Sequence, residues 1–231
     1  MAPIKLFADL KSQPCRAVYL FMKMNNIPFQ MVRIDLGSGE HLQEEFTKIS
    51  PIQRVPVIED NGFVLGESGA IFRYLARKFN VAEHWYPSKD LERQGRIDEY
   101  LNWHHTNIRT TAMMTFRHQF INTLRGKPIK EDEVKRFKTE LKKSINHIDK
   151  YFLKDEPYIG GKEISVADLQ AFCELMQLDI IGDENEYRFN PKVRAWADRV
   201  KAQIEPYFEP CQEEGISPMQ TIYNQLKSSK L

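Results

Sequence analysis

Residues 4–16, IKLFADLKSQPCR, decide how the first part of this chain folds. Residues 4–8 are a short apolar run that indicates a strand, and the segment after Pro14 begins a helical pattern. Ser12 therefore lies at a strand-to-helix turn, beside unpaired backbone N–H groups and the positive end of a helix dipole. A hydroxyl there either helps to bind an anion or only caps the helix, and this window alone favours the cap.

Alternating strands and helices continue through about the first 80 residues. The sequence predicts, in order, a helix at 16–26, a strand at 29–34, a short polar helix at 42–48, strands at 57–58 and 63–65, and a helix at 67–79. Asn61-Gly62 between the last two strands is a strong hairpin signal. The order β-α-β-α-β-β-α describes a compact α/β unit over residues 1–80.

The pattern changes after a linker at residues 81–90, VAEHWYPSKD, in which Pro87 is the break. Beyond the linker no segment has a convincing strand pattern. Helical periodicity covers residues 91–114, 131–152, 165–178, 191–202 and 217–227. We therefore predict an all-helical second domain over residues 91–231.

Composition argues against several classes of function. The 33 basic and 32 acidic residues give a net charge of +1, without the basic excess that nucleic-acid binding or an anionic membrane surface favours. Cys15, Cys173 and Cys211 are far apart and lack metal-ligand spacing, so no metal site is predicted. The chain has no membrane-spanning run and no signal-peptide pattern at its start. We expect a protein of the reducing cytoplasm.

Two further motifs in the first 80 residues concern a ligand. Val55-Pro56-Val57 places a proline directly before a short strand. A cis bond there would turn the Val55 backbone toward a ligand, although a trans loop proline is the commoner case. In the second motif Ser68 opens a helix and Glu67 precedes it, a pair that could bind a carboxylate and an ammonium group. Taken alone, this pair is more simply a helix cap.

Read together, residues 12–16 (SQPCR), Arg54-Val55-Pro56 and Glu67-Ser68 resemble the glutathione site of soluble glutathione transferases. A serine near the first strand resembles the theta class and the insect serine-type classes. Residues 84–88 (HWYPS) and 103–109 (WHHTNIR) resemble theta in particular. The resemblance extends over nearly the full chain. It implies a thioredoxin-like first domain, an all-α second domain that contributes the electrophile site, and a homodimer.

The resemblance also implies roles for individual residues. Ser12 would donate a hydrogen bond to the glutathione sulfur, and Arg109 on the first long helix would face the active site, unless it pairs with an acid such as Asp98 or Glu99. The implied glutathione contacts are His41, Arg54, Val55, Pro56, Glu67 and Ser68, of which His41 and Arg54 could instead be solvated charges. The implied electrophile site contains Met113, Met114 and Phe116, although such apolar stripes are more often core.

The activity implied is transfer of glutathione, a co-substrate, to small apolar electrophiles such as halides and epoxides, with reduction of organic peroxides left open. No metal is implied. The alternative is a protein on the same fold that binds glutathione or hydrophobic ligands without turnover. Phe7 lacks the hydroxyl of a catalytic tyrosine. Cys15 is expected to pack inside the first helix rather than to exchange thiols.

One motif supports the helical half independently of the ligand site. Ser165 precedes a helical pattern, and Asp168 follows three residues later, which is a variant of the capping box. We therefore expect Asp168 to have a structural role.

Overall fold

A four-stranded sheet organises the first part of the computed structural model, which describes residues 3–228. The strand order is β2-β1-β3-β4, with β2 parallel to β1 and the other two pairings antiparallel. The bounds are β1 Ile4–Ala8, β2 Phe29–Arg33, β3 Val57–Asp60 and β4 Phe63–Gly66. This sheet and its crossover helix confirm the predicted thioredoxin-like unit.

The short elements around the sheet follow the predicted order. They are α1 Gln13–Met24, a 3-10 turn η1 Glu40–Leu42, α2 Glu44–Thr47 and α3 Ser68–Lys78. Helix α1 begins three residues before the predicted start, because Pro14 is tolerated in the first turn, where its missing N–H has no helical partner. Asn61 and Gly62 both have positive φ, at 50° and 86°, as a two-residue hairpin of the predicted kind requires.

One long helix begins the second half of the chain and is longer than the predicted 91–114. It consists of α4 Leu91–His104, a π-helical turn η2 His105–Arg109, α5 Thr110–Phe116, a second π-helical turn η3 Arg117–Ile121, and α6 Asn122–Leu124. Each π-helical turn admits an extra residue per turn and therefore rotates the face that follows.

The other helices follow in the second half of the chain. The elements are α7 Glu131–His147 with η4 Ile148–Leu153, α8 Val166–Leu175 with η5 Met176–Ile181, α9 Asn185–Arg188, α10 Pro191–Ile204, η6 Glu205–Tyr207, η7 Cys211–Ile216 and α11 Ser217–Ser228. Between Lys78 and residue 228 the only β-type pairing is a single bridge of Tyr158 with Gly161. No helix among residues 3–228 is long and apolar enough to cross a membrane. The exact domain limits stay a prediction.

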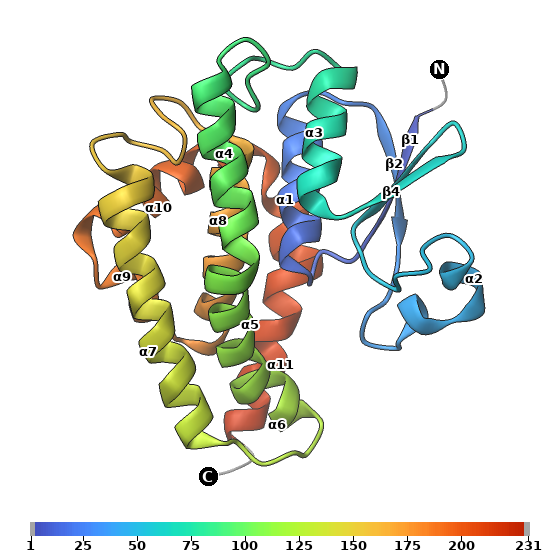
Figure 1. Cartoon of the computed structure of the whole chain (residues 1–231). Helices are drawn as coiled ribbons and strands as arrows, with labels where there is room; N and C mark the ends of the chain where they lie inside the picture. Colours follow the sequence, from blue (N-terminus) through green and yellow to red (C-terminus); the bar gives the residue numbers. More distant parts are fainter. Residues whose placement is uncertain (1–2, 229–231) are drawn as a thin grey trace.

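One hydrophobic core joins the two halves (Figure 1). Helix α1 packs against α8 on one side and against α3 on the other. Within this core Phe21 meets Phe72 and Trp85 edge-to-face, at ring-centroid distances of 5.4 and 5.6 Å. The Trp85 carbonyl accepts a hydrogen bond from the Val166 N–H at the start of α8. The linker is therefore attached to the helical half by a hydrogen bond. Helix α8, where this bond is made, is also the helix against which α1 packs.

The predicted capping box is present at the start of α8, and Asp168 does more than cap it. Its carboxylate accepts hydrogen bonds from the backbone N–H groups of Ser165 (2.8 Å) and Ile159 (2.7 Å) and from Nε1 of Trp196 (2.8 Å). Asp168 is fully buried, and burial raises its pKa to about 6. The residue therefore joins α8, the 158–161 loop and α10.

Asp168→Asn should lower the free energy of unfolding by about 2–4 kcal/mol near pH 4.5, because the amide cannot accept from all three donors and leaves buried N–H groups unpaired. The folded pKa of about 6 lies above the unfolded value of about 3.9, so the stability that Asp168 contributes is present at low pH and is lost as pH rises through 6. The difference in the free energy of unfolding between wild type and variant should therefore become smaller from pH 4.5 to 7. Urea unfolding at three pH values checks this, and a widening gap would contradict it.

Candidate active site

The register of the sheet brings three separate segments to one end of it. Phe7 of β1 is paired with Val57 of β3, and Val57 is paired with Gly66 of β4. The turn that follows β1, the residues that precede β3 and the residues that follow β4 therefore lie beside one another. The turn carries Ser12, and the other two segments carry Val55-Pro56 and Glu67-Ser68. Antiparallel pairing thus assembles the glutathione contacts predicted from distant parts of the sequence.

Ser12 occupies the N-cap position of α1 with extended backbone angles, φ −86° and ψ 130°. Its N–H donates to the Asp9 carbonyl at 2.9 Å, and its own carbonyl accepts from the Arg16 N–H at 3.1 Å. Its hydroxyl makes no capping hydrogen bond. Ser12 is thus the N-cap residue by its backbone position, but its half-buried hydroxyl accepts no hydrogen bond from the first helical N–H groups and instead lies against the Cys15 thiol.

Cys15 lies beside Ser12 and is fully buried in α1. Burial in apolar surroundings raises the pKa of its thiol to about 12. The thiolate is the nucleophilic form of cysteine, and at neutral pH this group is protonated. The position matches the expectation that Cys15 packs inside the first helix.

The Val55–Pro56 peptide bond is cis. Pro56 is buried, whereas Val55 is half-buried and lies just outside the paired residues of β3. The sequence left open whether the bond before Pro56 is cis or trans, and the structure has it cis.

Glu67 adopts a backbone conformation that non-glycine residues rarely take, with φ 62° and ψ 113°. Such a conformation costs about 1–3 kcal/mol and is most often found at functional sites. The Glu67 side chain is exposed, and within residues 3–228 its carboxylate has no hydrogen-bond or ion-pair partner. The next residue, Ser68, is 4% exposed at the first position of α3.

His41 and Arg54 both lie in the connection between β2 and β3. His41 belongs to η1, and its Nδ1 atom is buried without a hydrogen-bond partner among the described residues. Arg54 is exposed and forms no ion pair within the described part of the chain. Both groups can therefore approach an anionic ligand without first losing an ionic partner.

The long helix meets the Ser12 turn through Met113. Gln13, the residue after Ser12, donates a hydrogen bond from Nε2 to the Met113 sulfur at 3.5 Å. Arg109 precedes Met113 by four residues and therefore shares its helix face. Arg109 pairs with Glu174 of α8, its Nη1 lying 2.6 Å from Oε2.

This pairing corrects the alternative considered for Arg109. Asp98 pairs with Arg73, and Glu99 pairs with Arg96, so neither acid is the partner of Arg109. The partner comes from a helix 65 positions away, which local spacing on the first long helix could not reveal.

The predicted electrophile residues differ in burial. Met113 and Met114 are half-buried. Phe116 is 2% exposed, and its ring lies 5.1 Å from that of Phe120 in the core. Phe116 therefore departs from its predicted place on the wall of a site, because it fills the helical core instead.

Arg16, whose role was not predicted from the sequence, is fully buried. Its Nη1 donates to the carbonyls of Leu10 (2.9 Å) and Lys11 (3.1 Å), and its Nη2 donates to the Cys173 carbonyl (3.2 Å) and to Gln177 Oε1 (2.5 Å). The guanidinium therefore joins the two residues before Ser12 to α8. A basic residue inside an otherwise apolar helical stretch was the signal that could have found it.

Gly215 supports the same turn from the C-terminal side. A Cβ atom at this position in η7 would lie 2.4 Å from the Leu10 carbonyl oxygen, so the two backbones are in direct contact. The neighbouring Glu214 forms a two-point ion pair with Arg33 at the end of β2, at 2.5 and 3.0 Å. The Ser12 turn is thus bounded by α8 on one side and η7 on another.

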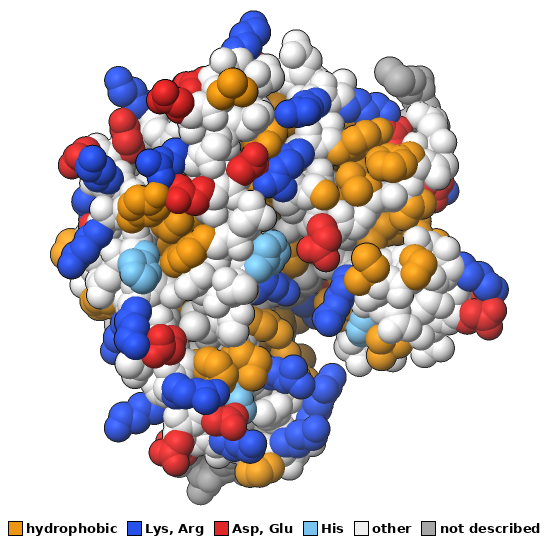
Figure 2. Space-filling model, in the orientation of Figure 1, with side chains coloured by type: hydrophobic (Ala, Val, Ile, Leu, Met, Phe, Trp, Pro, Cys, Tyr) orange, Lys and Arg blue, Asp and Glu red, His pale blue; other side chains and the backbone are white. Residues whose placement is uncertain are grey.

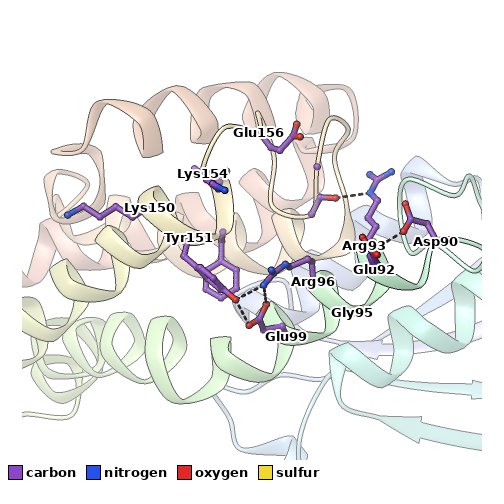
Figure 3. A pocket seen from close by; sticks show the side chains of 14 residues that line it. Asp90, Glu92, Arg93, Gly95, Arg96, Glu99, Lys150, Tyr151, Lys154 and Glu156 are labelled. Atoms are coloured by element: carbon purple, nitrogen blue, oxygen red, sulfur yellow. Dashed lines mark hydrogen bonds and ion pairs between the residues drawn. The ribbon is translucent and has the colours of Figure 1, made fainter.

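A cavity of about 1000 Å³ lies away from these residues. It follows the first turns of α4 and the segment 150–161, where Arg96 contacts Glu99 and Tyr151 (Figure 3). None of the predicted site residues lines it. Figure 2 instead shows the surface hollowed between the part of the molecule that carries α2 and the lower end of the long helix.

Comparison with known proteins agrees with this arrangement. The family model of the glutathione S-transferase N-terminal domain matches residues 2–77, and that of the C-terminal domain matches residues 114–210. Glutathione S-transferase theta-2 of Rattus norvegicus is 38% identical over 228 residues, covering 99% of this chain and 91% of that protein. Glutathione S-transferase theta-1 of Mus musculus is 41% identical over 202 residues, covering 87% of this chain and 83% of that protein.

Solved structures agree as well. A human theta-class glutathione transferase in complex with the glutathione conjugate of 1-menaphthyl sulfate has a TM-score of 0.90 at 37% identity, covering 100% of this chain and 92% of that one. Human glutathione transferase theta-2 in complex with glutathione and an unknown ligand has a TM-score of 0.88 at 38% identity, covering 99% and 92%.

The chain belongs to the glutathione S-transferase family and, within it, to the theta class. It is a glutathione transferase, with glutathione as its co-substrate. Among residues 3–228 no three His, Cys, Asp or Glu side chains gather as metal ligands would.

Gly215→Ala should reduce conjugation of glutathione, because the added methyl must displace the Leu10 carbonyl and with it the turn that carries Ser12. We expect a loss of about tenfold or more in kcat/KM, since small displacements of positioning groups weaken catalysis strongly. Gly95→Ala is the matched control, because a Cβ there meets open space in the exposed face of α4. Equal activity of both variants would show that the contact of η7 with Leu10 does not position the site.

Proposed function

We propose that this protein is a serine-type transferase in which the Ser12 hydroxyl donates a hydrogen bond to the thiolate of bound glutathione. The observation that carries the proposal is the Ser12 side chain, which occupies an N-cap position without capping the helix. The α1 N-terminus adds partial positive charge at the same point. Ser12 stabilises an anion in this mechanism, so it needs no histidine or aspartate to activate it.

The size of the Ser12 effect follows from the thiol chemistry. An ordinary thiol with a pKa near 8.5 is only about 3% ionised at pH 7. A hydroxyl hydrogen bond to a charged acceptor contributes about 1.5–3 kcal/mol, which lowers the thiol pKa by about one to two units. This raises the thiolate fraction by about tenfold or somewhat more, and the lower nucleophilicity of a weaker base offsets part of the gain. Most of the remaining acceleration comes from holding thiolate and electrophile together.

The rest of the glutathione molecule would bind along the end of the sheet. Glu67 would bind the ammonium group of the γ-glutamyl end and Ser68 its carboxylate, while the Val55 backbone before cis-Pro56 would pair with the peptide. The unpartnered carboxylate of Glu67 supports the first of these contacts. His41 and Arg54 would approach the glycyl carboxylate, a role supported by the orphaned Nδ1 of His41.

The electrophile would lie between the sheet and the long helix, against Met113 and Met114. In the conjugation step the sulfur electron pair forms a C–S bond to the electrophilic carbon, and a halide leaves with the bonding pair or an epoxide C–O bond opens. The thiol proton passes to solvent when the thiolate forms. Arg109 would add positive charge near the sulfur, since it shares a helix face with Met113.

Small halides and epoxides are the substrates that we propose, and organic peroxides are a second class that the same thiolate could reduce. A binding protein without turnover is the alternative on this fold. We also propose that residues 1–80 form the glutathione-binding domain, that residues 91–231 form the helical domain beyond an 81–90 linker, and that the protein is a cytoplasmic homodimer. Phe63 and Val64, 49% and 40% exposed on β4, support burial of that strand against a second copy.

Ser12→Ala should bind glutathione within a few-fold of wild type but conjugate an alkyl halide about tenfold or more slowly at pH 6.5, because one charge-assisted donor is lost. Ultraviolet titration of the bound thiolate should show a pKa higher by about one to two units. Ser12→Thr keeps a hydroxyl and is the matched control. An unchanged rate and thiol pKa in Ser12→Ala would remove Ser12 from the mechanism.

Cys15→Ser separates conjugation from thiol exchange. The buried, protonated Cys15 should be dispensable, so this variant should keep most conjugating activity. Complete loss in a protein with an unchanged circular-dichroism spectrum would favour thiol exchange at Cys15 instead. Wild-type protein that binds glutathione but turns over no halide, epoxide or peroxide would favour the binding alternative.

A further inference from the structure

A buried acidic residue of α8, Glu174, stands against the long helix, and nothing in the mechanism above uses it. Its side chain is fully buried. Its Oε2 accepts a 2.6 Å hydrogen bond from Nη1 of Arg109, which is 31% exposed at its side chain. Its Oε1 is buried and has no hydrogen-bond partner among the described residues. Within the described residues, one oxygen of this carboxylate therefore accepts a hydrogen bond from Arg109 and the other accepts none.

The groups around Glu174 come from three elements. From α4, His104 Nε2 approaches Oε2 at 3.7 Å, and the Tyr100 hydroxyl lies 3.2 Å from the other ring nitrogen of His104. From α8 itself, Gln170 Nε2 lies 3.5 Å from His104 Nε2. From α1, Arg16 donates to the carbonyl of Cys173, the residue before Glu174.

The charge state of this cluster follows from burial and pairing. Burial lowers the pKa of His104, so the ring is neutral at physiological pH. The pKa of Glu174 is lowered although burial opposes ionisation, because Arg109 and His104 favour the carboxylate. Glu174 and Arg109 therefore form an ion pair with one face open to solvent.

We propose that Glu174 is a positioning residue that holds the Arg109 guanidinium beside the glutathione sulfur and offsets part of its charge. The inference rests on the proposed approach of Arg109 to the sulfur. It adds a partner, Glu174, that sets both the position of the guanidinium and the size of its electrostatic effect on the thiol. Two facts carry it. Arg109 shares a helix face with Met113, which contacts the residue after Ser12. Among residues 3–228 its ionic partner is Glu174, which is fully buried and belongs to the helix that also anchors the Ser12 turn through Arg16.

Two substitutions at Glu174 distinguish its effect on the position of Arg109 from the effect of its negative charge. In Glu174→Gln the amide oxygen still accepts from Arg109, while the amide nitrogen takes the place of the oxygen that has no partner, so the position of Arg109 is kept and one negative charge is removed. In Glu174→Ala the anchor is lost, and Arg109 is free to turn toward water. If Glu174 had only a structural role, both variants would be less stable. The pKa of the bound thiol would then not fall in one variant and rise in the other.

We expect Glu174→Gln to lower the pKa of bound glutathione by about half a unit, because the uncompensated Arg109 charge favours the thiolate. Below that pKa the fraction of thiolate rises about threefold. The value of kcat/KM for an alkyl halide at pH 5.5 should also rise, but by less than this factor, because the less basic thiolate is a weaker nucleophile. Glu174→Ala should instead raise the thiol pKa toward that of Arg109→Ala. The matched control is Glu99→Gln, which removes the acid of an exposed ion pair with Arg96 and should leave the thiol pKa unchanged.

The measurement is ultraviolet titration of glutathione bound to each full-length variant, with thermal melts to confirm folding. If Arg109→Ala raises the thiol pKa and Glu174→Gln leaves it unchanged or raises it, the inference about Glu174 is wrong while the role of Arg109 stands. If Arg109→Ala leaves the thiol pKa unchanged, both proposals fail. Where Glu174→Ala does not fold, the sign of the shift in Glu174→Gln decides alone.

Discussion

The buried guanidinium of Arg16 is the constraint on which the arrangement of the site depends. It donates to the two carbonyls that precede Ser12 and to α8 at the same time, so the first strand-to-helix turn and the helical half form one unit. All of its hydrogen-bond partners are neutral oxygens, which distribute the charge without a carboxylate. Its Nε is buried without a hydrogen-bond partner among the described residues, so losing any of these four hydrogen bonds would leave the buried charge still less compensated, at a high cost in free energy.

Helix α8 has a larger role than its ten residues suggest. Consecutive residues, Cys173 and Glu174, contact the two arginines that flank the proposed site, one from α1 and one from the long helix. Its first turn is attached through Asp168 to α10 and to the loop before it. The catalytic half of the molecule is therefore supported by a helix that contributes no proposed contact to glutathione.

Much of the fold and part of the site could be predicted because their causes are local. The Asn61-Gly62 hairpin follows from the backbone freedom of two residues, and the capping box from a spacing of three. The partners of Arg109 and Asp168 could not be predicted in the same way. They come from residues 65 and 28 positions away, and only packing decides which buried group meets which.

The sequence by itself determined the order of strands and helices, the change to an all-helical second half, and the short motifs that resemble a glutathione site. Each of these depends on periodicity or on a motif of a few neighbouring residues. Only the tertiary structure decided that the Ser12 hydroxyl leaves the helix uncapped, that Phe116 belongs to the core, and that a backbone contact of Gly215 bounds the turn. These outcomes depend on which surfaces pack together, because hydrogen-bond partners and close contacts across the core are set by the fold as a whole and not by neighbours in the chain.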